Sequence, residues 1–319
     1  MCKILITEQL ENEGLQTLQD TNFEIVTNYS ISYDELLTTI HKYNCLIVKT
    51  LTNVNKNIIE NSKMLSCIGR IGVGVDNIDV KSATIKNIPV FFSPHGNTIP
   101  TAEHAIGMIL FMSKQFNIGH SMVINGIWDR ENYRNVQLFG KTLGIIGLGR
   151  IGKAVAKRAS AFGMKVIAYD PYIGYNDFII VNANPVSFTE LITTSDTISI
   201  HTPLTNETNN MINKNIFKLM KSNAILINTA RGKIVNENDL YYALKNNVIQ
   251  SAGLDVFQKE PPINSPLLQL SNCVLTPHIA SYTTEAKKQT SIELAQTIKD
   301  FLLNKIIKNC INYTQETFY

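Results

Sequence analysis

The segment Thr142–Asp170 constrains the fold of this chain more than any other stretch of its sequence. It begins with a short apolar run and continues into Gly147, Gly149 and Gly152, which have the spacing G-x-G-x-x-G. A helical stretch follows and ends at Gly163, and a second apolar run then leads to an acidic residue. This order of strand, glycine turn, helix and strand predicts a β-α-β unit.

The three glycines have separate roles in such a unit. Gly147 permits a tight turn, Gly149 lets the backbone approach a pyrophosphate, and Gly152 lets the helix pack closely on the strand. The helix N-terminus offers free N–H groups and a positive dipole end to phosphates. Asp170 lies 18 residues beyond Gly152, where a carboxylate can accept hydrogen bonds from ribose hydroxyls and repel a 2′-phosphate. The segment therefore predicts a dinucleotide site that takes NAD rather than NADP.

The composition narrows the class of protein. The chain has 319 residues, 44% of them hydrophobic, a mean hydropathy near zero and a net charge of +3. It contains no apolar run of the roughly 18–20 residues needed to span a bilayer, and no basic block that would favour nucleic acid or a membrane surface. The N-terminus has the pattern of a first strand and not of a signal peptide. These features favour a globular protein long enough for two domains.

The cysteines indicate a reducing compartment, the cytoplasm. They are five, scattered, and without metal-ligand spacing, so no metal site is expected. Most lie in or beside apolar runs, as small buried hydrophobic residues do. They are Cys2, Cys45, Cys67, Cys273 and Cys310.

The first 95 residues alternate short apolar runs with amphipathic stretches, which predicts a parallel sheet with helices on both faces. The expected strands are Lys3–Thr7, Glu24–Thr27, Cys45–Lys49, Cys67–Ile71 and Pro89–Phe92. The expected helices are Glu8–Gln19, Tyr33–His41, Lys56–Asn61 and Asn77–Lys86.

The expected fold class is α/β, with two doubly wound parallel sheets. A long helical stretch is expected over Thr101–Ile124, and a final helix over Thr284–Leu303 should pack on the first domain. A Rossmann NAD-binding domain is expected over residues 99–283, and a discontinuous flavodoxin-like substrate domain over residues 1–98 and 284–319. The cofactor would lie at the switch point of the Rossmann sheet, and the substrate in the cleft between the domains.

Three side chains that can carry chemistry, Arg231, Glu260 and His278, follow apolar strands in the second half of the chain. Because the carboxyl ends of parallel strands bind ligands in open α/β sheets, these side chains should converge near the nicotinamide. A histidine, with an ordinary pKa of about 6.5, can donate and accept a proton near neutrality. Glu260 would fix the tautomer of His278, and Arg231 would bind a substrate carboxylate and polarise its keto oxygen. Asp255 would reach the nicotinamide carboxamide.

Each of these residues also has a plain structural interpretation. His278 alone would more often be a structural histidine, Arg231 a surface ion-pair partner, and Glu260 with its two following prolines a loop turn. Their joint position after successive strands, beside a dinucleotide motif, favours catalysis by hydride transfer to a 2-keto acid.

The sequence resembles the D-isomer-specific 2-hydroxyacid dehydrogenases, and within them the 3-phosphoglycerate dehydrogenase branch. The resemblance covers nearly the whole chain and is strongest from about Leu46 to Ser281. The motifs that carry it are Gly69–Asp79, Gly96-Asn97, Trp128-Asp129-Arg130, Gly147–Asp170, Thr229–Gly232, Gly253–Val256 and Pro277-His278.

The resemblance implies further site residues and an assembly. Homodimers or larger homo-oligomers are usual in the family, with residues 119–137 in the interface. The NAD site would comprise Gly147, Gly149, Arg150, Ile151, Gly152, Asp170, Thr202, Thr229, Ala230, Asp255, His278 and Ala280. The substrate would be bound by Lys49, Arg70, the backbone N–H groups of Val73 and Gly74, Asn97, Arg231 and His278.

The resemblance leaves the substrate open. The phosphoglycerate branch needs cations near the substrate phosphate. Arg70 is one candidate, and Arg130 and Arg134 are two more, reaching in from the partner subunit. Arg130 and Arg134 are equally well explained as surface charges. Lys49 stands where the branch usually has arginine, and so loses the two-pronged geometry of a guanidinium. Hydroxypyruvate, glyoxylate and D-lactate remain alternatives to 3-phosphoglycerate. The chain stops at Tyr319, and regulatory C-terminal domains of the kind found in some branch members are not expected.

The sequence argues against two functions other than a dehydrogenase of 2-hydroxy acids. The family's formate-oxidising members typically have glutamine where this chain has Glu260, which argues against that activity. A non-catalytic NAD-sensing corepressor would show a degraded triad, whereas Arg231, Glu260 and His278 are all present.

Overall fold

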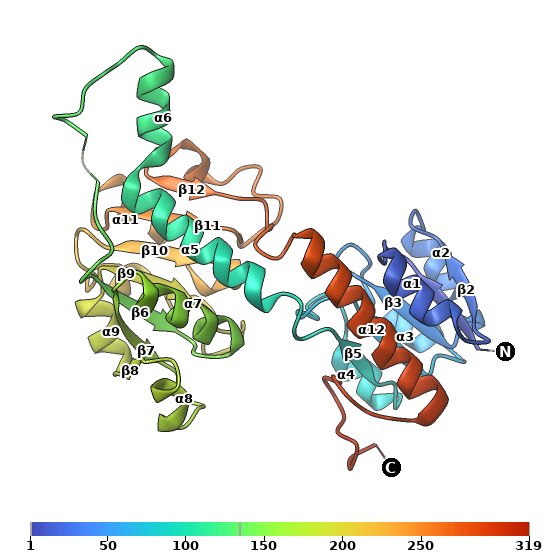
Figure 1. Cartoon of the computed structure of the whole chain (residues 1–319). Helices are drawn as coiled ribbons and strands as arrows, with labels where there is room; N and C mark the ends of the chain where they lie inside the picture. The colour runs from blue at the N-terminus through green and yellow to red at the C-terminus, as the bar shows by residue number, and fades with distance from the viewer. Residues whose placement is uncertain (1, 134, 319) are drawn as a thin grey trace. The chain divides into compact units, whose positions relative to one another are not determined.

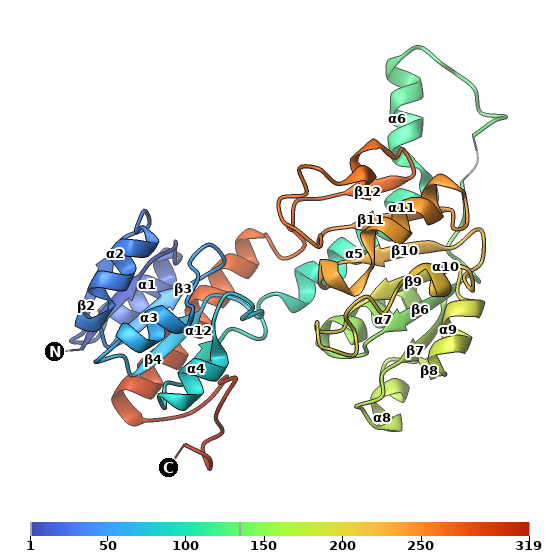
Figure 2. The same ribbon diagram turned by 180° about the vertical axis from the view of Figure 1, so that it is seen from behind.

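The computed structural model describes residues 2–133 and 135–318, and the chain divides into two compact units. Unit 1 comprises Met1–Asn97 and Tyr282–Tyr319, and unit 2 comprises Thr98–Ser281. Each unit is built on one sheet with helices on both of its faces (Figures 1 and 2). Within the described residues, no helix has the length and apolar character needed to cross a membrane.

Unit 1 contains a five-stranded parallel sheet with the strand order β2-β1-β3-β4-β5. This is the flavodoxin-like order, in which the chain reverses direction across the sheet between β1 and β3. The strands are β1 (Lys3–Ile6), β2 (Glu24–Thr27), β3 (Cys45–Val48), β4 (Cys67–Arg70) and β5 (Val90–Phe92). The helices are α1 (Asn12–Gln19), α2 (Tyr33–Thr39), α3 (Lys56–Asn61), α4 (Val80–Ile85) and α12 (Thr284–Asn304), with a 3₁₀ turn at Ile40–Lys42.

The central strands of unit 1 are apolar on both faces because helices cover both. Ile4 and Ile6 point to the core under α1 and α12, and Leu5 between them points to the core under α2, α3 and α4. Gly69 of β4 lets the C-terminal helix α12 lie close to the sheet. A Cβ added at Gly69 would touch Ile298 and Leu294, both of which are fully buried.

Unit 2 contains a seven-stranded parallel sheet with the order β12-β11-β10-β9-β6-β7-β8. Its switch point lies between β6 and β9. The strands are β6 (Thr142–Ile146), β7 (Lys165–Tyr169), β8 (Asn184–Pro185), β9 (Thr197–Ile200), β10 (Ile225–Asn228), β11 (Ser251–Leu254) and β12 (Cys273–Leu275). The helices are α5 (Thr98–Lys114), α6 (Phe116–Ile124), α7 (Arg150–Ala161), α8 (Tyr175–Ile179), α9 (Phe188–Thr194), α10 (Lys214–Phe217) and α11 (Glu237–Lys245), with 3₁₀ turns at Gly232–Ile234 and Pro266–Gln269.

Two hydrophobic cores flank this sheet, as both faces of a parallel sheet require. Helices α5, α7 and α8 pack on one face, and α9, α10 and α11 on the other. The structure thus confirms the α/β class with two parallel sheets. Most strand bounds agree with the sequence-based ones to within one residue.

The helical stretch expected over residues 101–124 is present, but it is divided into two helices. Helix α5 begins at Thr98 and ends at Lys114, and α6 begins at Phe116. Gln115 between them has a left-handed backbone, with a φ of 50°. The Tyr133 hydroxyl, 18 residues further along the chain, lies against the carbonyl oxygens of Lys114 and Gln115. These carbonyls thereby gain a partner outside the helix, which favours a break at this point.

Candidate active site

The glycine-rich turn of unit 2 lies at the switch point of the sheet. Gly147 follows β6 with a φ of 88°, a backbone conformation that favours glycine. A Cβ at Gly147 would lie 2.8 Å from the carbonyl carbon of His201 and 2.9 Å from the backbone nitrogen of Thr202. The turn is therefore packed against the end of β9, which places Thr202 beside the glycines.

Helix α7 begins directly after this turn. A Cβ at Gly152 would lie 2.2 Å from the Gly147 carbonyl oxygen, so only glycine allows the helix to pack this closely. Gly149 is the N-cap, and no side chain caps the helix. A Cβ at Gly149 would meet no described atom within 4 Å, so the backbone at the start of the helix is open on that side. The first N–H groups of a helix, here including those of Arg150 and Ile151, have no partner within the helix itself.

Asp170 closes the β-α-β unit. It follows β7, and its Oδ2 accepts a hydrogen bond of 2.9 Å from the backbone N–H of Leu148. Its Oδ1 accepts one of 3.0 Å from the N–H of Tyr172. These two bonds fix the carboxylate beside the glycine turn. Each oxygen retains a second lone-pair site for a ligand hydroxyl.

Close backbone packing brings the loop of Arg231 to the loop of Glu260. Arg231 follows β10, and a Cβ on the next residue, Gly232, would lie 2.0 Å from the Phe257 carbonyl oxygen. The Asn228 side chain fixes the turn from within, because its Nδ2 donates to the Arg231 carbonyl at 3.0 Å. One guanidinium nitrogen, Nη1, donates to the carbonyl oxygen of Ala230 at 2.7 Å.

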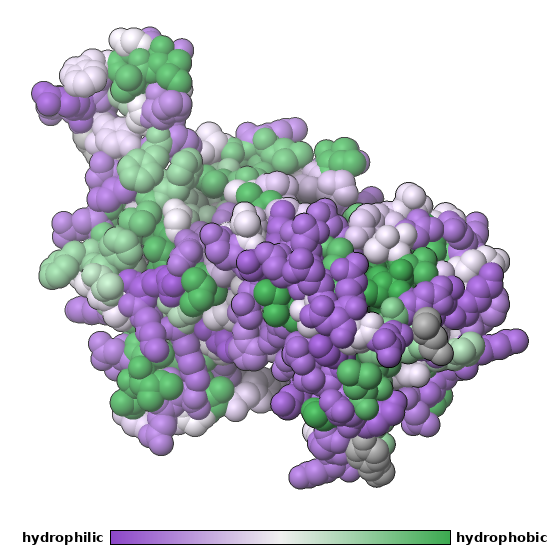
Figure 3. All heavy atoms as spheres, turned by 45° about the vertical axis from the view of Figure 1, so that its right-hand side comes forward, coloured by the Kyte–Doolittle hydropathy of each residue, from purple (hydrophilic) through white to green (hydrophobic). Residues whose placement is uncertain are grey.

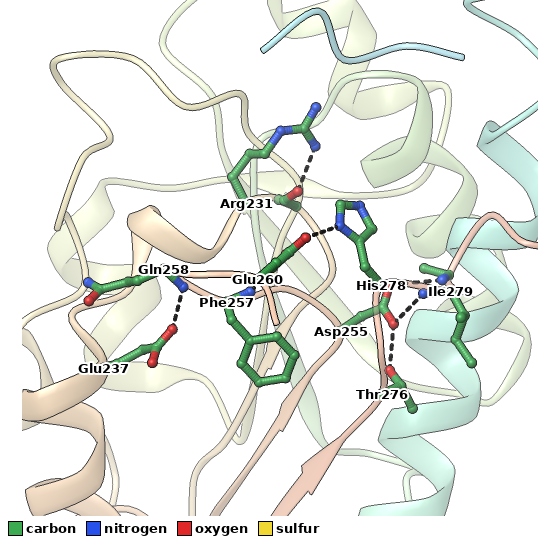
Figure 4. Close-up of polar contacts among 11 residues, drawn as sticks. Arg231, Glu237, Asp255, Phe257, Gln258, Glu260, Thr276, His278 and Ile279 are labelled. Atoms are coloured by element: carbon green, nitrogen blue, oxygen red, sulfur yellow. Dashed lines mark hydrogen bonds and ion pairs between the residues drawn. The ribbon is translucent and has the colours of Figure 1, made fainter. Parts of the chain in front are cut away.

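His278 and Glu260 form the central contact of the site (Figure 4). The His278 Nδ1 lies 2.8 Å from Glu260 Oε2, and the other carboxylate oxygen accepts a 3.1 Å bond from the N–H of Phe257. A carboxylate can only accept, so Nδ1 carries the hydrogen. Within the described residues His278 Nε2 has no hydrogen-bond partner, and it is the ring nitrogen available to a substrate.

The electrostatics of this pair favour a charged carboxylate. Burial raises the pKa of Glu260, but the hydrogen bonds from His278 and the Phe257 N–H, with the charges of His278 and Arg231, outweigh burial and leave the pKa below its ordinary value. Both side chains remain partly open to solvent, with 43% of His278 and 38% of Glu260 exposed. An ionised Glu260 accepts the Nδ1 hydrogen and holds the imidazole in one orientation.

Asp255 is completely buried, and both of its oxygens bind the loop that carries His278 (Figure 4). Oδ1 accepts bonds from the Thr276 hydroxyl at 2.6 Å and the Ile279 N–H at 2.9 Å. Oδ2 accepts a 2.8 Å bond from the Ala280 N–H. His278 itself has a φ of 55°, uncommon for a residue with a side chain. The carboxylate of Asp255 therefore fixes the loop in this conformation, and its contact with a nicotinamide stays a prediction.

In unit 1, the segment 49–52 is held by a single carboxylate at the switch point of the sheet. Glu8 accepts backbone hydrogen bonds of 2.8–3.0 Å from all four of its residues. From the opposite side, Asn77 Nδ2 donates to the carbonyls of Lys49 and Thr52, at 3.2 and 2.6 Å. Burial raises the pKa of Glu8, but the four N–H bonds outweigh it and lower the pKa below the ordinary value.

The Lys49 side chain, fixed in this way at its backbone, lies against an aromatic ring. Its Nζ is 4.9 Å from the centroid of Tyr282, and Lys287 Nζ is 3.9 Å from the same centroid. Among the residues that the structure describes, neither lysine has a carboxylate within 4 Å. The sequence did not single out Tyr282, Lys287 or Glu8. Only the fold shows that they lie beside Lys49.

A second group of expected substrate residues lies at the ends of β4 and β5. Gly72 has a φ of 118°, and a Cβ there would lie 1.8 Å from Arg70 Nη1 and 3.6 Å from Asn97 Nδ2. Arg70 Nη1 donates to the Ile71 carbonyl at 2.8 Å. Val73 and Gly74 follow in the same loop and are partly exposed. Arg70 and Asn97 are therefore neighbours across the glycine.

Arg130 and Arg134 are the remaining cations expected near a substrate phosphate, and both follow α6 in the sequence. Arg130 is exposed in the segment that follows α6. Arg134 lies outside the described residues. Helix α6 projects from the body of unit 2 (Figures 1 and 2), and it has no buried residue.

Residues 106–280 match the family described as D-isomer specific 2-hydroxyacid dehydrogenase, NAD binding domain. The chain belongs to the D-isomer-specific 2-hydroxyacid dehydrogenase family. The match contains every residue expected at the cofactor and every residue of the Arg231, Glu260 and His278 group.

Proteins similar to this chain are named for different substrates. The chain is 40% identical over 311 residues to a D-3-phosphoglycerate dehydrogenase of Archaeoglobus fulgidus, covering 97% of this chain but 59% of that protein. It is 39% identical to a hydroxypyruvate reductase of Thermotoga maritima, covering 93% of this chain and 97% of that one. The chain thus spans about three fifths of the phosphoglycerate dehydrogenase. A crystal structure of D-lactate dehydrogenase from Aquifex aeolicus, complexed with NAD and lactic acid, has 29% identity and a TM-score of 0.87, covering 98% of this chain and 99% of that one.

The cofactor of the matched family domain fits the residues of unit 2. A pyrophosphate would be held by the N–H groups at the N-terminus of α7, where a Cβ at Gly149 would meet no described atom within 4 Å, and Asp170 would accept hydrogen bonds from ribose hydroxyls. The Thr229 hydroxyl is buried and has no hydrogen-bond partner within the described residues. A buried hydroxyl without a partner costs free energy, which a bound ligand would recover. Thr229 directly precedes Ala230 and Arg231, at the edge where the nicotinamide is expected.

Proposed function

We propose that the chain is an NAD-dependent oxidoreductase that interconverts a D-2-hydroxy acid and its 2-keto acid. The observation that carries the proposal is the 2.8 Å contact between His278 Nδ1 and Glu260 Oε2, which leaves Nε2 available in the unit that holds the NAD motif. NADH, when bound, supplies a hydride to the keto carbon. The chain must then supply one proton to the keto oxygen, so that a hydroxyl forms.

His278 is the proposed proton donor in the direction of reduction. Its protonated ring gives the Nε2 proton to the oxygen as the C=O bond becomes C–OH, and the neutral ring retains its Nδ1–H bond to Glu260. In the reverse direction the neutral ring accepts the hydroxyl proton at Nε2. Glu260 stabilises the imidazolium in both directions, because its lowered pKa keeps it charged.

Arg231 is the proposed group for the substrate carboxylate and keto oxygen. Its guanidinium lies next to the Glu260 loop, and a planar fork can donate to two oxygens at once. Positive charge beside the keto oxygen stabilises the negative charge that develops there during hydride transfer.

The substrate proposed first is 3-phosphohydroxypyruvate, the keto form of 3-phosphoglycerate. Phosphoglycerate dehydrogenases at about 40% identity support it. So does unit 1, where Lys49 and Lys287 lie against the Tyr282 ring without a carboxylate partner among the described residues. Two ammonium groups on one ring favour an anion near them. Unit 1 is accordingly the proposed substrate-binding domain.

Hydroxypyruvate is the second candidate, because the Thermotoga relative named for its reduction matches this chain over nearly the full length of both proteins. It has the same carbon skeleton without the phosphate. NADH oxidation with 3-phosphohydroxypyruvate, hydroxypyruvate, glyoxylate and pyruvate distinguishes the two. Fast turnover of the phosphorylated acid supports the first proposal, and turnover of the unphosphorylated acids alone overturns it. Absence of turnover with all four would overturn the dehydrogenase proposal.

The lysine pair has its own test. Lys287→Gln should raise KM for the phosphorylated acid roughly ten-fold and leave KM for hydroxypyruvate unchanged, since only the former presents a dianion. Lys288→Gln is the matched control, because Lys288 is the next residue and forms an ion pair with Glu13 instead. Equal effects of the two substitutions would contradict a phosphate role for Lys287.

A homodimer or larger homo-oligomer is also proposed. The segment of α6 and the residues after it expose large apolar side chains, which Figure 3 shows as green and pale spheres on the projecting arm. Isolated apolar side chains are common on surfaces, but a contiguous group marks an interaction site. The group comprises Phe116 (54% exposed), Ile118 (45%), Val123 (61%), Ile124 (69%), Ile127 (50%) and Trp128 (77%).

A further inference from the structure

A second histidine, His104, lies one hydrogen bond away from the network that holds the His278 loop. It belongs to α5, and its Nε2 is 3.1 Å from the Thr276 hydroxyl oxygen. The same nitrogen is 3.6 Å from Asp255 Oδ1, and the His104 side chain is 20% exposed. Among the described residues, His104 is the only basic side chain within 4 Å of the fully buried Asp255 carboxylate.

The direction of each hydrogen bond follows from the donor inventory. Asp255 is a carboxylate that can only accept, so the single hydroxyl hydrogen of Thr276 is donated to it across 2.6 Å. Toward His104 the hydroxyl can then only accept. Nε2 of His104 therefore carries a hydrogen, and the order of donation is His104 to Thr276 to Asp255.

This series of hydrogen bonds ends on the backbone of the loop that carries His278. Asp255 also accepts the N–H groups of Ile279 and Ala280, which are the two residues after His278. The N–H of His278 donates to the Thr276 carbonyl at 3.0 Å. Residues on both sides of His278 are thus held by one buried carboxylate, while the backbone of His278 has a φ of 55°.

We propose that His104 is a positioning residue for His278, acting through Thr276 and Asp255. The inference rests on the proposed function of His278. A histidine at this position supplies a donor that orients the Thr276 hydroxyl and a partial counter-charge for a carboxylate removed from water. Without that donor, the carboxylate holds the loop less firmly and the Nε2 atom of His278 is less well placed for proton transfer.

Three variants of the full chain separate positioning from bulk packing. His104→Leu keeps apolar volume and removes the donor. His104→Gln restores an N–H at nearly the position of Nε2, whereas the shorter His104→Asn places its N–H near the position of Nδ1. We expect His104→Leu and His104→Asn to lower kcat roughly ten- to fifty-fold on the best 2-keto acid of the panel. We expect His104→Gln to remain within about three-fold of the unsubstituted chain.

Two further readouts identify the cause of any loss. The Kd of NADH, measured by fluorescence, should change less than about two-fold in all three variants, since His104 contacts the loop and not the glycine turn. Amide hydrogen exchange of a peptide spanning residues 276–282 should be faster in His104→Leu and unchanged in His104→Gln.

The outcomes separate this inference from the proposed function. Unchanged kcat, or unchanged exchange of the 276–282 peptide, in His104→Leu would overturn the positioning role in an enzyme that is otherwise active. A loss that His104→Gln fails to rescue would assign His104 to packing alone. If the unsubstituted chain reduced none of the keto acids, the proposed function would be overturned. The proposed role of His104 in catalysis would then be overturned as well.

Discussion

A Cβ on Gly232 would lie 2.0 Å from the carbonyl oxygen of Phe257, closer than any side chain can approach. This contact joins the loop of Arg231 to the loop of Glu260. It explains why the residue after the arginine is a glycine. Because Gly232 has no side chain, the two loops can approach this closely. The proposed roles of Arg231 and Glu260 depend on that approach.

Gly232→Ala is therefore expected to separate the two loops. Because backbone atoms and not a flexible side chain would have to move, we expect a loss of roughly 2–4 kcal/mol in the free energy of unfolding, and of at least about 100-fold in kcat/KM. Urea denaturation and steady-state kinetics check these values. Gly107→Ala is the control, since a Cβ there meets nothing within 4 Å. An active, stable Gly232→Ala enzyme would show that the packing is unimportant.

His278→Ala should abolish turnover and leave NADH binding intact, because the ring donates a proton and does not form the glycine turn. Glu260→Gln should lower kcat roughly 10- to 100-fold, since the imidazole loses the anionic partner that holds its orientation. Stopped-flow kinetics and NADH titration measure both. Turnover that survives in His278→Ala would disprove the acid–base assignment.

Glu8→Gln should destabilise unit 1 by roughly 2–4 kcal/mol, because an amide offers one acceptor oxygen to four N–H groups and turns two donors toward them. The folded pKa of Glu8 lies below its ordinary value of 4.5. Its stabilisation is thus present above about pH 4.5 and lost as the pH falls through the folded value. Unfolding at pH 7 and pH 4 tests this. A stability difference between the two chains that did not shrink at pH 4 would contradict the role of the charge.

His201→Gln should make the stability of unit 2 less sensitive to acid. Burial lowers the pKa of His201 to about 3, and its Nε2 lies 2.8 Å from the Ser199 hydroxyl. Since the unfolded chain takes up this proton near pH 6.5 and the folded chain does not, stability is complete above that pH and falls as the pH drops toward 3. Between pH 7 and pH 5 the unsubstituted chain should lose roughly 1–2 kcal/mol more than the variant. Parallel losses in both chains would refute the prediction.

Charges placed in the α6 arm should prevent self-association. Ile124→Glu combined with Trp128→Glu replaces two of the most exposed apolar side chains of the arm, at 69% and 77% exposure. A carboxylate buried at an interface without a partner is strongly unfavourable, so we expect a shift from oligomer to monomer in light scattering. Leu51→Glu is the control, because Leu51 is 89% exposed in unit 1 and lies outside the arm. Oligomers of unchanged mass in the double variant would place the interface elsewhere.

Much of the site could be predicted, because it depends on local sequence patterns or on geometry that all parallel sheets share. The spacing of Gly147, Gly149 and Gly152 follows from the turn geometry that a strand-to-helix connection needs. The convergence of Arg231 and Glu260 could be expected because the carboxyl ends of parallel strands lie along one edge. Once His278 and Glu260 are placed at this same edge, a hydrogen bond between an imidazole and a carboxylate can be expected from the residue types alone.

Other features were decided by the tertiary structure alone, because their partners are distant in sequence. At the break after α5, the Tyr133 hydroxyl lies beside the carbonyls of Lys114 and Gln115. The helical pattern of residues 101–124 contains no sign of it.

The same reason applies to Glu8 and His104. Glu8 meets its four N–H partners across 41–44 residues, and His104 reaches Thr276 across 172. Sequence patterns determine which strands and helices form, since these depend on periodicity and near neighbours. Which polar groups meet after the elements pack depends on the register and on the switch points of the sheets, and only the folded chain decides it.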